Sequence, residues 1–152
     1  MINIIFFCDD EGNGAYPKNR YLDMILNYVE KKGELAVIEK INNYACLHSE
    51  NEKIKFEDVI ENKNVKEIIK VDETSSDVES LKNDAQRWAK ELDGETFVVR
   101  VDRKGNHEYT SVELERELGA EIWKISKSDV DLKNPQKTYR VFIQDKRAFV
   151  SV

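Results

Sequence analysis

The sequence predicts an α+β protein built from two domains. Some short segments have apolar residues at every second position or in a continuous run, as strands do. Other segments, which lie between them, have apolar residues at helical spacing. A Ser-rich bend at residues 74–77 divides an acidic first part from a more basic second part. We therefore expect one domain over residues 1–73 and another over residues 74–152, with the second module beginning as early as about residue 65.

The first domain shows a regular order of strands and helices. Gly33 stands where a helix is expected to stop, and Asn42-Asn43 predicts a hairpin turn. The predicted elements are strand 2–8, helix 18–32, strand 34–41, strand 43–48, helix 55–62 and strand 65–71. This β-α-β-β-α-β order is that of the ferredoxin-like split βαβ unit.

The second domain is predicted to begin with a helix after the Ser-rich bend. Ser76 and Glu79 have the spacing of a capping box, and Asp93-Gly94 is expected to end the helix. Its apolar residues form one stripe, which consists of Val78, Leu81, Ala85, Trp88, Ala89 and Leu92. The stripe predicts that one face of this helix is buried against a sheet.

The remainder of the second domain alternates between strands and a helix, which predicts an α/β arrangement. Strand 96–102 is followed by a helix from Ser111 to about Leu118, which we expect to close at Gly119. Thr110 and Glu113 form a second possible capping box. The last predicted strands are 121–126, 138–143 and 147–151.

Composition and charge narrow the class of protein. The formal net charge of the 152 residues is −6, but residues 96–152 hold 11 Lys/Arg against 9 Asp/Glu and are locally basic. No apolar run is long enough to span a bilayer, so we expect no membrane partner. The first residues lack a basic leader, and Cys8 and Cys46 fall in strand-like segments. These features predict a cytoplasmic protein with buried thiols.

The sequence offers little sign of catalytic chemistry. It lacks a Gly-rich phosphate loop, a Gly-x-Ser-x-Gly elbow and the Cys/His spacing of a zinc site, so we expect no cofactor. Asp9, Asp10 and Glu11 follow the first strand and could hold Mg²⁺, because hard cations prefer clustered carboxylates. A solvated acidic loop is the favoured interpretation, since loops are commonly polar.

Basic residues gather around strand 96–102 and the bend that follows it. Arg100 lies in the strand, and Arg103, Lys104 and His107 flank Gly105, where the chain can turn sharply. An alternative for Arg100 is a structural ion pair with Asp131 or Glu113. For Arg103 and Lys104 we expect exposure. Arginine binds phosphate through two parallel hydrogen bonds and stacks on bases, which suits RNA.

Two further places carry candidate contacts. Arg116 is expected in the helix that begins near Ser111, and Lys133 and Asn134 precede Pro135 in a loop. We expect Lys146 and Arg147 at the tip of a hairpin between the last two strands, and this position is enough to explain two basic residues there.

These residues resemble a THUMP domain, the RNA-binding module of tRNA thiouridine synthases, methyltransferases, pseudouridine synthases and the adaptor of tRNA cytidine acetylation. The first part resembles, more weakly, the ferredoxin-like domain that precedes the module in thiouridine synthases. The family pattern is matched by Phe97, Val99, Arg100, Arg103, Gly105, His107, Ser111, Glu113, Gly119, Asp131, Leu132, Asn134 and Pro135.

The resemblance implies tRNA binding at the acceptor stem and the 3′ end. The sequence contains neither the Ser-Gly-Gly-x-Asp-Ser loop of the synthase's ATP-pyrophosphatase domain nor another catalytic domain of the family, so we expect no enzymatic activity. The predicted function is a stand-alone adaptor that presents tRNA to a separate tRNA-modifying enzyme, with a homodimer left open. The expected RNA-binding residues are Arg100, Arg103, Lys104, Gly105, His107, Arg116, Lys133 and Asn134.

A protein-interaction module is the alternative to the tRNA-binding adaptor. In that case the acidic N-terminal domain would recruit a modification enzyme, and the chain would make little contact with RNA.

Overall fold

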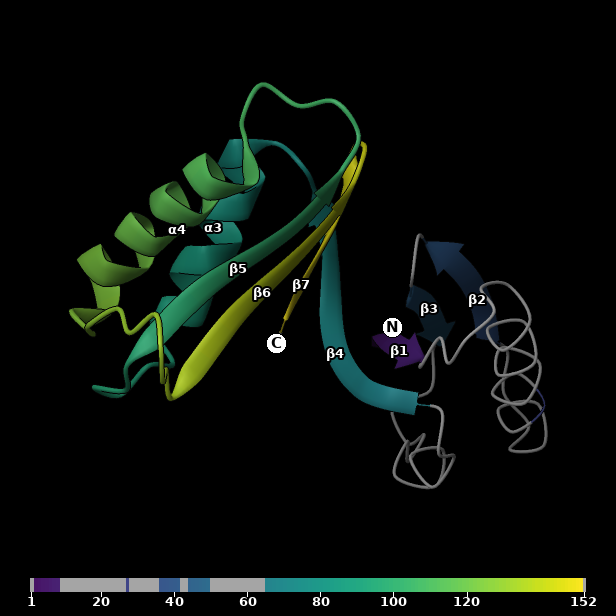
Figure 1. Ribbon diagram of the computed structural model, residues 1–152, viewed down its shortest axis with the longest axis horizontal. Coiled ribbons are helices and arrows are strands. Elements are labelled where there is room, and N and C mark those ends of the chain that lie inside the picture. The colour runs from purple at the N-terminus through teal and green to yellow at the C-terminus, as the bar shows by residue number, and fades with distance from the viewer. Residues whose placement is uncertain (1, 9–26, 28–35, 42–43, 50–64, 152) are drawn as a thin grey trace. The chain divides into compact units, whose positions relative to one another are not determined.

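The computed structural model describes residues 2–8, 27, 36–41, 44–49 and 65–151, and it divides into two compact units (Figure 1). Unit 1 covers residues 1–71 and unit 2 covers residues 72–152. Each unit is described by itself.

The described part of unit 1 is an antiparallel sheet. It contains β1 (Ile2–Cys8), β2 (Ala36–Ile41), β3 (Tyr44–Ser49) and the first residues of β4 (Val65–Ser75), in the order β2-β3-β1-β4. All three neighbouring pairs are antiparallel. The predicted strands are therefore confirmed, although β4 continues four residues beyond its predicted end. The helices predicted at 18–32 and 55–62 lie outside the described residues, apart from the helical Asn27, and so do Asp9, Asp10 and Glu11.

Unit 2 is a four-stranded mixed sheet with two helices on one face (Figure 1). The strands follow the order β4-β7-β6-β5, so β6 is an inner strand and β5 lies at the edge. The β5–β6 pair is parallel and the β6–β7 pair is antiparallel. The elements in chain order are α3 (Val78–Ala89), β5 (Phe97–Lys104), α4 (Ser111–Ser126), β6 (Lys137–Gln144) and β7 (Arg147–Ser151).

The core of unit 2 lies between the helices and the sheet. Alternate residues of the strands face the helices, because successive side chains of a strand point to opposite faces. Phe97 and Val99 of β5 pack there with Tyr139 and Val141 of β6. The helices contribute apolar residues one turn apart, which are Leu81, Ala85 and Ala89 from α3 and Leu114, Leu118 and Ile122 from α4. No helix among the described residues has both the length and the hydrophobicity needed to cross a membrane.

Helix α4 is longer than predicted. The helix passes through Gly119 and ends at Ser126, with Lys127 in the left-handed region at φ 56°. The predicted end at Gly119 and the predicted strand 121–126 are therefore wrong. A single glycine costs a helix only about 1 kcal/mol. The burial of Leu118 and Ile122 on the same face outweighs that cost.

The two helix starts differ in how well they were predicted. Thr110 is the N-cap of α4 and accepts the Glu113 N–H at 3.2 Å, which confirms the second capping residue. The first capping box is wrong, because Asp77 rather than Ser76 caps α3 and accepts the Ser80 N–H at 2.9 Å. Asp77 satisfies a backbone donor that the first turn leaves without a helical partner.

Candidate nucleic-acid interface

The predicted RNA-binding residues fall into two groups in unit 2. Arg100 lies near the 131–135 loop, together with Lys133 and Asn134. Arg103, Lys104, Gly105 and His107 lie at the other end of β5, where the chain bends towards α4 (Figure 1). The surroundings of the two groups differ.

The Arg100 side chain is exposed and is held by a backbone carbonyl. Its Nη2 donates to the Leu132 carbonyl oxygen at 3.2 Å. Asp131 Oδ1 accepts the backbone N–H groups of Asn134 and Lys133, both at 3.0 Å. These two N–H groups hold the pKa of the Asp131 carboxyl below its ordinary value. Among the described residues, Arg100 therefore does not form the ion pair with Asp131 or Glu113 that the sequence left open.

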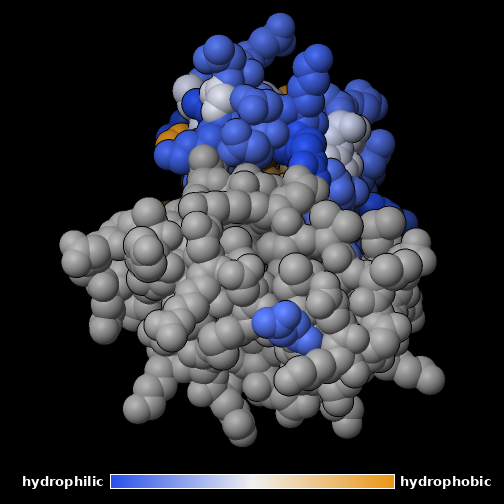
Figure 2. All heavy atoms as spheres, turned by 90° about the vertical axis from the view of Figure 1, so that its right-hand side faces the viewer, coloured by the Kyte–Doolittle hydropathy of each residue, from blue (hydrophilic) through white to orange (hydrophobic). Residues whose placement is uncertain are grey.

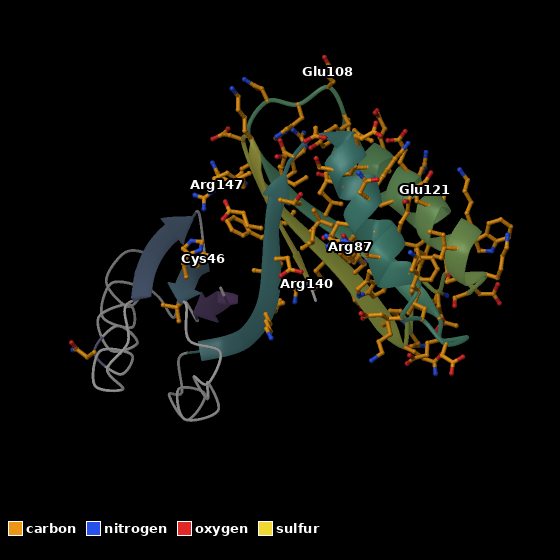
Figure 3. The ribbon with its side chains drawn as sticks, turned by 180° about the vertical axis from the view of Figure 1, so that it is seen from behind. Cys46, Arg87, Glu108, Glu121, Arg140 and Arg147 are labelled. Atoms are coloured by element: carbon orange, nitrogen blue, oxygen red, sulfur yellow. The ribbon has the colours of Figure 1, made fainter. Side chains whose placement is uncertain are left out.

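The loop beside Arg100 presents further polar side chains. Lys133 and Asn134 are both exposed, and the Asp131 turn fixes the backbone that carries them. Arg140 of β6 is the register partner of Arg100 and stacks over the Phe142 ring at 5.1 Å (Figure 3). The sequence does not indicate that Arg140 lies beside Arg100, because a parallel pairing between residues 40 positions apart carries no local signal.

The bend after β5 is held together by side-chain contacts. Arg103 is half-buried, and its Nη1 donates to the Gly105 carbonyl oxygen at 3.0 Å and to His107 Nδ1 at 2.9 Å. His107 Nε2 lies 2.6 Å from the Asp145 carbonyl oxygen in the β6–β7 turn. A guanidinium can only donate and a carbonyl can only accept, so His107 is the tautomer with hydrogen on Nε2.

The same bend is tied to the start of α3. The His107 and Tyr109 rings stack with centroids 5.2 Å apart, and the Tyr109 hydroxyl donates to the Ser76 carbonyl oxygen at 2.5 Å. Burial raises the pKa of the Tyr109 phenol. Glu108 lies at the outer tip of the loop (Figure 3). We call Ser76, Arg103, Gly105, His107, Tyr109 and Asp145 the Gly105 junction.

The Gly105 junction changes the interpretation of two predicted RNA contacts. The expectation that Arg103 is exposed is wrong, since its guanidinium is engaged inside the junction. His107 is likewise occupied by Arg103 and the Asp145 carbonyl. Lys104 is exposed. The junction orders the chain around Lys104, while Arg100, Lys133 and Asn134 present polar groups at the other end of β5.

Gly105 is the residue on which the junction depends most. Its φ is 105°, in a region that residues with a Cβ rarely adopt, and an added Cβ would meet Asp145 Oδ1 at 2.2 Å. We expect Gly105→Ala to lower the free energy of unfolding by about 1–3 kcal/mol. Gly94→Ala is the matched control, because Gly94 has φ 72° but open space around it. Urea denaturation of both variants measures the difference, and equal losses would contradict the close approach at Asp145.

Arg147 at the hairpin is explained by a structural contact. Its Nε donates to Glu73 Oε1 at 2.7 Å and its guanidinium stacks over Phe149 (Figure 3). This contact agrees with the hairpin explanation proposed for this residue.

The face of the molecule in Figure 2 shows mainly hydrophilic side chains where the described residues are visible.

Arg116, on the exposed side of α4, lies between the two groups: it borders a groove that Arg100 also lines and a pocket that His107 lines. The groove has a volume of about 530 Å³ and lies between α4, the edge strand β5 and the 130–132 loop. Sequence reasoning missed this groove. The sequence feature that could indicate the groove is a pair of apolar residues, Val130 and Leu132, on either side of Asp131, because loops are usually polar.

A second polar network joins the buried residues Asp84 and Tyr139 to the exposed Arg87. Asp84 of α3 is buried, and its Oδ1 accepts the Tyr139 hydroxyl at 2.5 Å while its Oδ2 pairs with Arg87 Nη2 at 2.8 Å. Burial, followed by the charge of Asp84, raises the pKa of the Tyr139 phenol. The described residues contain no cluster of His, Cys, Asp and Glu that could hold a metal ion. The Tyr139–Asp84 hydrogen bond links β6 to α3.

The fold and its motifs match a known family of domains. The family model described as THUMP domain matches residues 75–152, just over half of the chain. The chain belongs to the THUMP domain family. The predicted resemblance is confirmed, and the matched residues include both groups of candidate RNA contacts.

Similar proteins agree with this assignment. A protein named tRNA sulfurtransferase from Thermoplasma volcanium is 31% identical over 129 residues, which cover 84% of this chain and 26% of that protein. The chain spans about a tenth to a quarter of the length of the curated relatives that it matches.

Two solved structures share the fold. PH1313 from Pyrococcus horikoshii Ot3 has a TM-score of 0.81 at 15% identity, and the match covers 99% of this chain and 53% of that one. A 4-thiouridine synthetase in complex with RNA and ATP has a TM-score of 0.75 at 16% identity, with coverage of 99% and 40%.

Proposed function

We propose that this chain is a stand-alone tRNA-binding adaptor, which acts in the cytoplasm and presents tRNA to a separate tRNA-modifying enzyme. Unit 2 would hold the RNA through phosphate contacts, and the modification itself would be carried out by the partner. The observation that carries the proposal is the exposed group Arg100, Lys133 and Asn134 within a THUMP domain.

The geometry of this group suits a folded polyanion. Arg100 uses one donor on the Leu132 carbonyl, and a guanidinium has five, so donors remain for a phosphate. The Asp131 carboxylate accepts two backbone N–H groups of its own loop and therefore points into that loop. Its negative charge is therefore partly compensated beside Lys133. A relative named tRNA sulfurtransferase and a neighbour solved with RNA support the choice of tRNA as ligand.

Salt-dependent binding tests the proposal. We expect fluorescence anisotropy with labelled tRNA to give a log–log slope of about −2 to −5 against salt concentration, as for three to five phosphate contacts. The double variant Arg100→Ala/Lys133→Ala should bind more weakly, and its slope should be about 2 smaller in magnitude.

The control removes a single positive charge at a site away from the loop. Lys124→Ala on α4 removes one exposed cation that already pairs with Glu121 at 3.2 Å, so binding should be unchanged. A slope near zero, or equal affinity for an unstructured oligonucleotide of the same length, would overturn tRNA binding. Equal weakening by Lys124→Ala would show that the effect is not specific to the loop.

A further inference from the structure

The groove beside β5 gathers most of the exposed apolar surface in the described residues. Five large apolar side chains are exposed among the described residues, and four of them line the groove: Val112, Trp123, Val130 and Leu132. Leu132 is 67% exposed and Trp123 is 48% exposed. The fifth, Ile125, lies outside the groove. Apolar residues clustered in this way commonly mark a site of interaction.

The floor of the groove includes backbone at the edge of a sheet. The backbone N–H and carbonyl of Phe97 point away from β6. The N–H donates to the Asp129 carbonyl oxygen at 3.0 Å, and the Phe97 carbonyl oxygen accepts the Asp131 N–H at 2.9 Å. Backbone groups alternate in direction along a strand, so those of Val99 point to the same edge. Val101 follows, and its N–H is capped by Glu115 Oε1 at 3.1 Å. A short stretch of edge around Val99 therefore faces the groove.

The charges around the groove are mainly positive. Arg116 on α4 and Arg100 on β5 border it, and both side chains are exposed. Glu115 is the acidic residue among the described lining residues, and the Val101 N–H already engages its carboxylate. An occupant with acidic side chains would therefore be complementary to this surface.

We propose that this groove binds a short extended segment of a partner protein, with apolar side chains at alternate positions and acidic side chains between them. The segment would pair with the edge at Val99 and place its apolar side chains against Trp123 and Leu132. The acidic side chains between them would point to the opposite side of the sheet, where Arg100 lies. Adding a strand at a sheet edge is a common mode of peptide recognition. The partner would be the modifying enzyme, so this identification rests on the proposed function.

The lining favours a peptide over a nucleotide base. Three of the four apolar residues are aliphatic and offer no flat surface for stacking. Lys127 Nζ lies 4.4 Å from the Trp123 ring centroid and occupies one face of that ring. The site also differs from the acidic N-terminal domain, which the sequence suggested as an alternative docking surface.

A phage-displayed library of random twelve-residue peptides, selected against the full chain, tests the proposal. We expect enriched peptides to carry aliphatic or aromatic residues at alternate positions with Asp or Glu between them. Leu132→Ser and Trp123→Ser should each weaken the best peptide by about ten-fold or more, as for central interface residues. Ile125→Ser removes an exposed apolar residue outside the groove and should leave binding unchanged.

The same variants are measured for tRNA binding, so that the two proposals can fail separately. Peptide binding that depends on Leu132 without any tRNA binding would overturn the adaptor function and keep the groove. No enriched peptide, or peptides that tolerate Leu132→Ser and Trp123→Ser, would overturn the groove proposal. Loss of tRNA affinity in these two variants without peptide binding would assign the groove to RNA instead.

Discussion

Replacing Ile122 by alanine is expected to lower the free energy of unfolding by about 2–5 kcal/mol, which is the usual cost of removing a large aliphatic side chain from a packed core. Ile122 is fully buried and packs in the cluster that contains Leu118 and Phe97. The loss comes from the transfer of the removed methylene groups and from the cavity that remains. Urea denaturation monitored by circular dichroism measures it.

Ile125 on the same helix supplies the matched control. The Ile125 side chain is 40% exposed, and Ile125→Ala should change the free energy of unfolding by no more than about 0.5 kcal/mol. The comparison tests the extension of α4 beyond Gly119, because it depends on which side chains the last turns bury. Equal losses for the two alanine variants would contradict the position of this helix.

Tyr139→Phe is expected to destabilise unit 2 by about 1.5–3 kcal/mol at neutral pH, the range for a hydrogen bond to a charged group. The variant keeps the ring, which packs against Trp88 at a centroid distance of 5.0 Å, and removes the hydroxyl that donates to Asp84. Asp84 would retain Arg87 as its partner. Thermal denaturation at pH 7 measures the change, and a loss below about 0.5 kcal/mol would contradict a strong contact.

The pH dependence provides a second readout of the same contact. The folded state raises the pKa of Tyr139, whereas an unfolded tyrosine has a pKa of about 10. The folded state therefore keeps this proton where the unfolded state releases it, so the contribution of Tyr139 to stability should be constant below about pH 10 and fall above it. This alkaline loss should be smaller in Tyr139→Phe. Parallel profiles for the two proteins would show that Tyr139 does not cause it.

The elements that the sequence predicted correctly have strong local patterns. The strands combine apolar runs with flanking turn residues, and Thr110 has the spacing of a helix cap. Gly119 predicts a helix end, but the packing of Ile122 in the core extends α4 to Ser126. The sequence does not distinguish Ser76 from Asp77 as the cap of α3, because both residue types are good caps and only the backbone conformation separates them.

The candidate site shows the same division. Motif spacing identified the basic residues near β5, and the exposure of Arg100, Lys104 and Lys133 agrees with that interpretation. Spacing could not reveal that Arg103 and His107 bond to each other, since this depends on how the loop folds over the β6–β7 turn. Their direct contact with RNA, like the domain limits at residues 73 and 74, stays a prediction.

The inner position of β6 governs how unit 2 can assemble. Its strand neighbours, β5 and β7, come before and after it along the chain, and the whole of α4 intervenes between β5 and β6. Until Lys137–Gln144 is in place, β5 has no strand beside it apart from the single bridge at Val130. The apolar faces of α3 and α4 then lack most of the sheet against which they pack. A chain at that stage of folding exposes apolar surface and is prone to aggregate. Rapid formation of the non-local β5–β6 pair, or binding by a chaperone, would protect it.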